Sequence, residues 1–515
     1  MSEHEEPRSL RRRALLLGGA GLGAGLGAGL VTTGPLAEIA QAVPGTTTRH
    51  HWSGRFKDPN TPDWHYLPFT MPRGVRSLEV HYDFSPTDTG FGFSFNVVDI
   101  GIFDSSGKGL GNAAGFRGWS GGARRHFRIT RHWATPGYLA GPLTPGRWHI
   151  ALGPFLIRPP GTPWKVTLTL EHGDPVEPRF QPDPAPVAVP GTGPGWYRGD
   201  LHTHSVFSDG RWTPGQLVAQ AQSRGLDFLG TSEHNTDAAQ RIFGRAVPDG
   251  FLVVSGEEVT TRSGHWLATG IPPGTWIDWR YRAADDELGR FTDLTRSLGG
   301  VAIAAHPQVP VDGTRWDFGA TFVHMDAVEV WNGPWSIFNQ LMVAAWQQLL
   351  ADGTFVPAVG NSDSHHDGQV VGLPMTAYRL DTLSSAAVVA AVKGGHAWIA
   401  ESSDVGLTFT ATGAGPTTAV GGPGDTVALT TGEQLAVHLD VTGVPGCVAQ
   451  LFTKTGLLTG AAADQNGHVV LDADVDPAQA FVRAEVRRPA GTVDPTTDDL
   501  SAAPMVALTN PVFAG

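Results

Sequence analysis

The stretch from His202 to Gly210, HTHSVFSDG, follows a short hydrophobic segment and holds three metal-binding side chains in one run. Side chains of a strand alternate between its two faces, so His202 and His204 are predicted to point the same way. The turn through Ser208 and Gly210 then brings Asp209 beside them. Imidazole and carboxylate together suit Zn, Mn or Fe. An HxH pair alone is more often two half-exposed histidines, so this prediction depends on partners further along the chain.

Four downstream segments follow one pattern, in which an apolar run ends at a His, Glu or Asp. Continuous apolar runs of this kind indicate strands buried on both faces, as in a parallel sheet covered by helices. The segments are LDFLGTSEHN with Glu233 and His234, GFLVVSGEE with Glu257 and Glu258 and then His265, GGVAIAAHP with His306, and TFVPAVGNSDSHH with Asp363, His365 and His366. Five such endings in order predict a metal site at the carboxyl ends of the strands.

A helix is predicted directly after the first of these endings. Thr213 and Gln216 form a capping box, Pro214 takes the first helical position, and Gly225 stops the helix. The order of strand, ligand, helix and strand predicts an α/β fold, either a barrel or an open sheet. In both, the polar groups gather at the carboxyl ends of the strands.

Taken together, these motifs resemble the PHP superfamily, named for polymerase and histidinol phosphatase. Its members share an HxH opening, a DH-type second motif, a single Glu, an HP motif and a closing DxH. The resemblance covers roughly residues 196 to 400 and implies a distorted seven-stranded β/α barrel. HTHSVFSDG is similar to the phosphoesterase branch, in which Asp fills a place that other members give to His. The family's second motif usually has Asp before its His, and here that residue is Glu233.

The resemblance implies two or three divalent metal ions, which would be Zn, Mn or Fe. In the implied arrangement, one glutamate bridges the first two metals and a metal-bound hydroxide near Glu257 and Asp363 attacks the substrate. The implied ligands are His202, His204, Glu257 and Asp363 for the first metal, Glu257, His265 and His306 for the second, and Asp209, His234 and His365 for the third.

Five further residues are candidates for contacting substrate or supporting the ligands, namely Glu233, Glu258, Arg262, Asn332 and His366. Arg262 could contact an anionic group, and a solvated arginine is the equal alternative. Asn332 could orient substrate or water, with a turn role equally open. Glu258 and His366 flank predicted ligands, and both are expected to point away from the metals if the chain is extended there.

The predicted ligand set favours an enzyme, with a small-molecule phosphoesterase as the leading interpretation. The one cysteine, Cys447, lies outside the ligand segments, and no serine or cysteine nucleophile is needed. The alternative is a carbamate or carboxylic ester hydrolase. It rests on a narrower resemblance to exported PHP hydrolases of the carbaryl-hydrolase type, carried by the phrases SEHN, EVWN and TNP and by domain order. A third interpretation is a non-catalytic extracellular binding protein.

The amino terminus predicts export by the twin-arginine route to the periplasm or the extracellular space. Residues 11–13 are three arginines, a Gly- and Ala-rich weakly hydrophobic segment follows, and residues 40–42 have the small-residue pattern of a cleavage site. We therefore expect no stable membrane span after cleavage. The competing interpretation is a retained membrane helix, because Gly21, Gly25 and Gly29 have GxxxG spacing.

The 515 residues exceed one ordinary domain, and alternating runs such as SLEVHYDF and LAVHLDV predict β-sandwiches on both sides of the barrel. The predicted segments are a signal peptide at 1–42, a β-sandwich at 43–172, a proline-rich linker at 173–195, the barrel at 196–402 and a smaller β-sandwich at 403–515. A net charge of −13 argues against nucleic acid as a partner, and one cysteine excludes an intrachain disulfide framework. The oligomeric state and the role of the sandwiches stay open.

Overall fold

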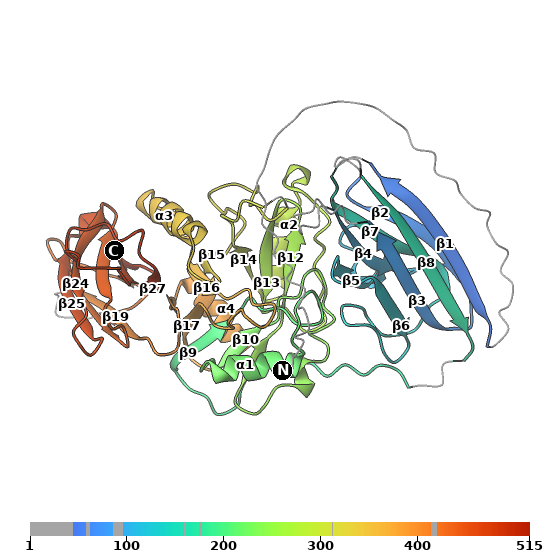
Figure 1. The fold of residues 1–515 in the computed structure, drawn as a ribbon. Coiled ribbons are helices and arrows are strands. Elements are labelled where there is room, and N and C mark those ends of the chain that lie inside the picture. The colour runs from blue at the N-terminus through green and yellow to red at the C-terminus, as the bar shows by residue number, and fades with distance from the viewer. Residues whose placement is uncertain are drawn as a thin grey trace, which may run out of the picture.

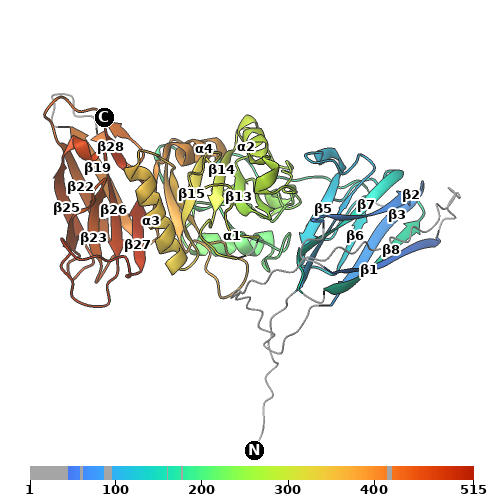
Figure 2. The same cartoon turned by 90° about the horizontal axis from the view of Figure 1, so that it is seen from above.

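The computed structural model describes residues 45–57, 62–85, 96–158, 161–174, 178–311, 313–413 and 420–515. The predicted export signal and the competing membrane helix both fall in residues 1–44, outside the described residues. Within the described part, no helix is long and apolar enough to cross a membrane. The chain is a strand-rich α/β protein, and Figures 1 and 2 show an N-terminal, a central and a C-terminal region in a row.

The N-terminal region holds two four-stranded antiparallel sheets, with strand orders β1-β8-β3-β6 and β2-β7-β4-β5. Side chains alternate between buried and accessible along most of these strands, and the buried faces share one core. A short 3-10 turn, η1 (Ala113–Gly115), precedes β5. The strands are β1 (Thr47–Phe56), β2 (His65–Met71), β3 (Val75–Phe84), β4 (Val97–Phe103), β5 (Phe116–Gly121), β6 (His126–Thr130), β7 (Gly146–Leu156) and β8 (Thr162–His172).

The described part of the segment predicted as a linker, residues 173–195, contains no helix, and its only strand residue is Gly195, where β9 begins. It is nevertheless fixed to the central region by backbone hydrogen bonds. Asp183 N donates to Arg241 O at 2.7 Å, and Val189 N donates to Leu383 O at 2.9 Å. Ala185 is buried in the core beneath it. The linker is therefore an extended chain packed against the central region.

The central region contains two groups of strands. One comprises β9 (Gly195–Asp200), β10 (Phe228–Gly230), β11 (Leu252–Val254), β17 (Met375–Leu380) and β18 (Ala397–Ala400), in the order β11-β10-β9-β17-β18. The other comprises β12 (Gly256–Thr261), β13 (Gly264–Thr269), β14 (Val301–Ala305), β15 (Ala327–Asn332) and β16 (Ala358–Asn361), hydrogen-bonded in that order.

Strands β9, β10 and β11 are parallel, as are β14, β15 and β16, whereas β12 and β13 form an antiparallel hairpin. The described strands therefore form two hydrogen-bonded sheets, and no single closed ladder of seven strands joins them. The two sheets meet where β11 leads into β12 and at isolated bridges that pair Thr203 with Ser364 and His234 with Glu258.

Four helices cover the sheets: α1 (Pro214–Ser223), α2 (Leu288–Ser297), α3 (Ile337–Ala351) and α4 (Ser385–Gly394). The prediction for α1 is confirmed, since Thr213 and Gln216 form the capping box, Pro214 begins the helix, and Gly225 follows it at φ +72°. Helix α2 packs on β14, α3 on β15, and α4 on β17. Three further 3-10 turns are η2 (Phe243–Arg245), η3 (Ala283–Asp285) and η4 (Pro477–Gln479).

The C-terminal region continues a sheet of the central region. Strand β27 pairs antiparallel with β18, with Trp398 opposite Thr509, so one sheet of eleven strands crosses the boundary predicted at residue 403. Its C-terminal members are β21 (Thr426–Val427), β23 (Val448–Thr453), β24 (Gly456–Ala462), β26 (Phe481–Arg487), β27 (Met505–Thr509) and β28 (Val512–Ala514). A second sheet contains β19 (Gly406–Gly413), β20 (Val420–Gly421), β22 (Leu435–Thr442) and β25 (Val469–Val475).

Aromatic side chains join the N-terminal region to the central one. Phe116 stacks on Trp276 with centroids 4.3 Å apart, and Trp119 meets Trp279 at 4.6 Å. The same buried cluster includes Phe481 of the C-terminal region. Aromatic side chains of this size bury large areas, so the three regions share a continuous core.

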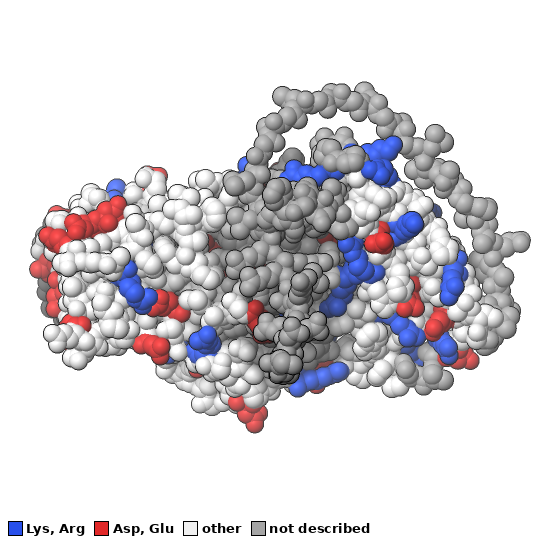
Figure 3. Space-filling model, in the orientation of Figure 1, with Lys and Arg blue, Asp and Glu red and all other residues white. Residues whose placement is uncertain are grey.

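Charged side chains are mixed on the face drawn in Figure 3. Blue basic and red acidic side chains alternate over the N-terminal region, and acidic side chains gather at the opposite end of the molecule. Among the described residues of that face, no continuous basic stripe is present.

Candidate metal centre

Loops and strands of the central region bring nine His, Asp and Glu side chains together. Eight of them are among the nine ligands predicted from the sequence, and the ninth is Glu258. They follow or belong to six strands of the two sheets. The residues are His202, His204 and Asp209 after β9, His234 after β10, Glu258 on β12, His265 on β13, His306 after β14, and Asp363 and His365 after β16.

The first group consists of His202, His204, Glu258 and Asp363, of which only Asp363 is partly exposed, at 22% of its side chain. The Nε2 atoms of His202 and His204 lie 3.2 and 3.0 Å from Oδ1 of Asp363. The same two nitrogens lie 3.3 and 3.4 Å from Oε2 of Glu258. Two imidazoles and two carboxylates therefore face one another at nearly equal spacing.

The second group consists of Glu258, His265 and His306, and it uses the other carboxylate oxygen of Glu258. Oε1 of Glu258 lies 2.8 Å from Nδ1 of His265 and 3.2 Å from Nε2 of His306. Because Oε2 faces the first group and Oε1 the second, Glu258 lies between them as a bridging carboxylate would.

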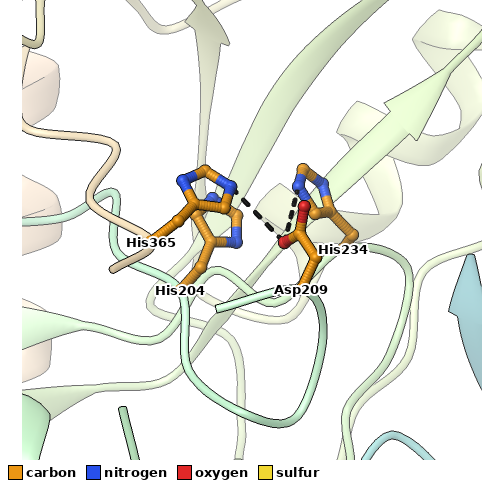
Figure 4. A group of neighbouring side chains, drawn as sticks. All are labelled: His204, Asp209, His234 and His365. Carbon is orange, nitrogen blue, oxygen red and sulfur yellow. Dashed lines mark ion pairs between the residues drawn. The ribbon is translucent and has the colours of Figure 1, made fainter. Parts of the chain in front are cut away.

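The third group, His204, Asp209, His234 and His365, is drawn in Figure 4, and three of its side chains are partly exposed to solvent. Oδ1 of Asp209 lies 3.5 Å from Nε2 of His234 and 3.4 Å from Nε2 of His365. The ring of His204 stacks on those of His234 and His365, with centroids 4.3 and 4.0 Å away, and the latter two centroids are 5.8 Å apart. The side chains of Asp209, His234 and His365 are 46%, 23% and 20% exposed, so the centre is approached from this side.

The prediction that Glu257 bridges the metals and Glu258 points away is wrong. Glu257 lies on the opposite face of β12, where its Oε2 accepts a hydrogen bond from Ile277 N at 3.0 Å. Strand β11 ends at Val254 and β12 begins at Gly256. The alternation of side chains therefore restarts at β12, and its phase is set by pairing with β13 rather than by the apolar run before it.

The surroundings of the two glutamates shift their pKa values in opposite directions. Burial alone would raise the pKa of Glu258, but His234, His202 and His265 hold that pKa well below its usual range. Burial raises the pKa of Glu257 well above its usual range, because no cation lies beside it to offset the loss of water. These surroundings therefore favour the charged form of Glu258 and the neutral form of Glu257.

The donor atoms fit divalent cations. Four buried atoms of the first group face one another and have no hydrogen-bond partner among the described residues, namely Nε2 of His202 and His204, Oε2 of Glu258 and Oδ1 of Asp363. An unsatisfied buried polar atom costs about 1–3 kcal/mol, and several in one place are unusual in a native protein. Imidazole and carboxylate donors at this spacing match Zn, Mn or Fe.

The backbone at the centre is held in sparsely populated conformations. His306, Asp363 and Asn235 have φ values of +32°, +50° and +58°. Such residues cost on the order of 1–3 kcal/mol each and cluster at functional sites. The cost at Asp363 is offset in part by its backbone N–H, which donates to His202 O at 2.9 Å and fixes the two loops together.

Two buried carboxylates that were not predicted support the ligands. Glu329 on β15 accepts from Nδ1 of His202 at 2.9 Å and from the backbone N–H of His306 at 3.0 Å. Asp200 at the end of β9 accepts from Ser362 N at 3.1 Å, and burial raises its pKa to about 6 although its hydrogen bonds lower it. A sequence signal existed for Glu329, because an acidic residue inside the buried run AVEVW needs a partner.

Glu329→Gln is expected to lower kcat/KM about 10–100-fold and to weaken metal binding by a similar factor. The amide can accept at only one of the two positions, and its own NH2 would oppose either the donor Asn332 at the Oε2 position or the donor Asn361 at the Oε1 position. Steady-state kinetics with metal analysis of the purified variant measures both effects. Glu287→Gln, at an exposed ion pair on the surface, is the matched control. Equal kinetics in the two variants would contradict the role of Glu329.

Glu233 anchors the HTHSVFSDG loop without joining the three groups. It accepts from the backbone N–H of Ser205 at 3.1 Å and from the hydroxyl of Ser208 at 2.5 Å. Burial raises its pKa. The N-terminal region also contacts this loop, since Arg124 donates to the carbonyl of Val206. The loop is therefore positioned from both sides.

The other three residues predicted to contact substrate or support the ligands are Arg262, Asn332 and His366. Arg262 is neither solvated nor directed at the centre, because it donates to the carbonyls of Pro154 at 2.9 Å and Asp63 at 3.2 Å in the N-terminal region. Asn332 donates to Oε2 of Glu329 at 3.0 Å. His366 is partly exposed and donates from Nδ1 to the carbonyl of Asp367 at 2.8 Å.

A small cavity of about 40 Å³ lies beside the second group. His306, Glu329 and Asn332 form its inner wall, and Phe338 and Met342 of α3 contribute apolar surface. It is large enough for a few water molecules or a small substituent of a substrate.

Comparison with known proteins gave no family model and no curated protein that matches the chain. Two solved structures are similar to it. A two-domain protein from Bacteroides vulgatus containing a predicted PHP-like metal-dependent phosphoesterase is 18% identical, with a TM-score of 0.33 over 65% of this chain and 100% of that one. An amidohydrolase from Chromobacterium violaceum is 20% identical, with a TM-score of 0.25 over 34% of this chain and 89% of that one. The first bears the name of the superfamily that the sequence motifs resemble.

Proposed function

We propose that this chain is a hydrolase with two or three divalent metal ions that cleaves phosphoesters of small molecules. The observation that carries the proposal is the sharing of side chains between donor groups, with Glu258 between the first and second and His204 between the first and third. Bound at such spacing, divalent ions lower the pKa of water and stabilise charge on the attacked centre. Closely spaced ions suit the three oxygens of a phosphate.

The residues of the chain perform three tasks in this proposal. Glu258, whose pKa is lowered by the surrounding histidines, sets the spacing of the first two groups, while Glu329 fixes the ring of His202. His202 and His204 are fully buried, which excludes water from the inner side. Substrate approaches over Asp209 and His365, where the centre is open.

Hydrolysis of carbamates or carboxylic esters is the second candidate, and two observations favour it. Arg262, the predicted contact for an anionic group, is occupied by carbonyls of the N-terminal region. The cavity beside His306 offers apolar surface from Phe338 and Met342 and neutral amides, which suit an uncharged substrate.

Turnover of 4-nitrophenyl phosphate and of a naphthyl carbamate by the same preparation tests the proposal. A phosphoesterase is expected to prefer the phosphate by at least about tenfold in kcat/KM, corresponding to about 1.4 kcal/mol in the transition state. A reversed preference supports the second candidate. No turnover of either, with no bound metal, would leave the non-catalytic binding protein as the better interpretation.

We also propose a finer description of the fold. The two sheets of the central region correspond to a distorted barrel opened between β11 and β12 and between β16 and β17, and the flanking pairs of sheets correspond to β-sandwiches. Support comes from the packing of β16 on β17 and β18 and from the shared cores of the flanking sheets.

Export by the twin-arginine route is part of the same proposal and rests on the residues before position 43. Replacing Arg11, Arg12 and Arg13 by lysine is expected to keep the protein in the cytoplasm, because the arginine pair is what the export signal presents. Cell fractionation with immunodetection measures the distribution. Unchanged export of the lysine variant would contradict the twin-arginine route.

A further inference from the structure

A further set of metal-binding side chains lies on the N-terminal region. Glu79 and His81 are on β3, and His126 is on the neighbouring edge strand β6. Leu78 and Val80 are buried, so Glu79 and His81 share the outer face of the sheet. His126 pairs directly opposite His81 across the two strands. All three side chains therefore project from one spot on the outer face.

Both imidazoles direct the same nitrogen at one oxygen atom. Nε2 of His126 lies 2.7 Å, and Nε2 of His81 lies 3.2 Å, from Oε1 of Glu79. The two rings stack with centroids 4.2 Å apart and an angle of 30° between their planes. In a tetrahedral site with metal–ligand bonds of about 2.0–2.1 Å, neighbouring ligand atoms are about 3.3 Å apart. Small side-chain movements bring the three atoms to that spacing.

We propose that Glu79, His81 and His126 bind one divalent transition-metal ion such as Zn²⁺, with the remaining coordination positions open to solvent. Two imidazoles and one carboxylate are a donor set that suits Zn and neighbouring metals. The side chains are 34%, 58% and 42% exposed, respectively, so an ion can reach them directly from solution.

Other surface histidines of the described chain lack this convergence. His51 lies on the same sheet face but two strands away, on β1, where it meets the hydroxyl of Thr167 at 3.1 Å. In the C-terminal region His438 pairs with Asp472 alone. A single imidazole with one oxygen is an ordinary surface hydrogen bond. The third ligand atom distinguishes the set on β3 and β6.

This site is independent of the centre in the central region. The sheet β2-β7-β4-β5 faces the central region, since Phe116 and Trp119 of β5 pack on two tryptophans of the central region, Trp276 and Trp279. The sheet that carries Glu79 lies on the far side of that layer (Figures 1 and 2). An ion bound at Glu79 would therefore contribute nothing to the proposed hydrolysis. Zinc binding at this site can be tested independently of hydrolytic activity.

Zinc binding by the full chain tests the proposal. Protein freed of metal by a chelator is dialysed against a series of free Zn²⁺ concentrations, and bound zinc is measured. The His81→Ala, His126→Ala double variant is expected to bind one Zn²⁺ fewer than wild type, with unchanged hydrolytic activity. His51→Ala is the matched control and is expected to bind as many ions as wild type.

Glu79→Gln gives a second measurement that does not depend on the double variant folding well. It is expected to weaken binding of that one ion at least about tenfold, because the amide is a poorer ligand than the carboxylate. Identical zinc binding by wild type and the double variant at every concentration would overturn the proposal. So would an equal loss in His51→Ala.

Discussion

Glu258→Ala is expected to abolish hydrolysis and to remove most of the bound metal, whereas Glu257→Gln leaves both close to wild type. Glu258 offers one oxygen to each of two donor groups, so its loss weakens both at once. The effect should exceed the about 10–100-fold that a supporting residue contributes. Glu257 is buried, burial raises its pKa, and its Oε2 accepts a hydrogen bond from Ile277 N. Glutamine is uncharged and keeps an acceptor oxygen for that bond.

The adjacent positions of Glu257 and Glu258 make this comparison internally controlled. The measurements are kcat/KM, metal content by elemental analysis, and thermal unfolding to show that both variants are folded. An equal loss of metal and activity in Glu257→Gln and Glu258→Ala would contradict the assignment of Glu258, rather than Glu257, to the face of β12 that meets the metal centre.

Glu485→Ala is expected to destabilise the protein by about 3–5 kcal/mol, the cost of leaving buried charges unpaired. Glu485 lies between Arg483 at 2.7 Å and Arg487 at 2.6 Å, and all three side chains are at most 4% exposed. The arginines also bond to Gln347 and Gln340 of α3, which ties β26 to the central region. The loss is therefore expected to loosen the contact between the two regions as well.

Acid should remove the same contribution from the wild-type protein. Burial raises the pKa of Glu485, but the two guanidinium groups outweigh it and hold the pKa below its usual range. A depressed carboxyl pKa stabilises the fold above the unfolded-state pKa of about 4.3, and the stabilisation is lost as the pH falls toward the folded-state value. Glu485→Gln should lack this part of the acid dependence.

Denaturant unfolding at neutral pH and through the acid range measures both effects. Glu401→Ala is the matched control, because Glu401 pairs with Arg488 near the surface and such pairs contribute about 0–1 kcal/mol. Equal destabilisation by Glu485→Ala and Glu401→Ala would show that the buried Arg483–Glu485–Arg487 ion pairs contribute no more to stability than a surface pair.

Much of the centre could be predicted because its residues follow a local pattern. His202, His204, His234 and His306 each come just after a strand or at its end, and a strand end is recognisable from an apolar run that stops. The capping box of α1 is likewise a local signal. Glu329 could not be assigned in the same way, because its partners His202 and Asn361 are far away in the sequence.

The sequence by itself determined the chemistry of the donors and their order along the chain, since residue type and strand ends are local properties. The tertiary structure decided which face each side chain occupies. It selected Glu258 over Glu257 through the pairing of β12 with β13, and it turned Arg262 toward the N-terminal region. It also joined β18 to β27 in one sheet. These outcomes depend on register and on contacts between distant segments, and a period of two residues means that a shift of one position reverses every side chain.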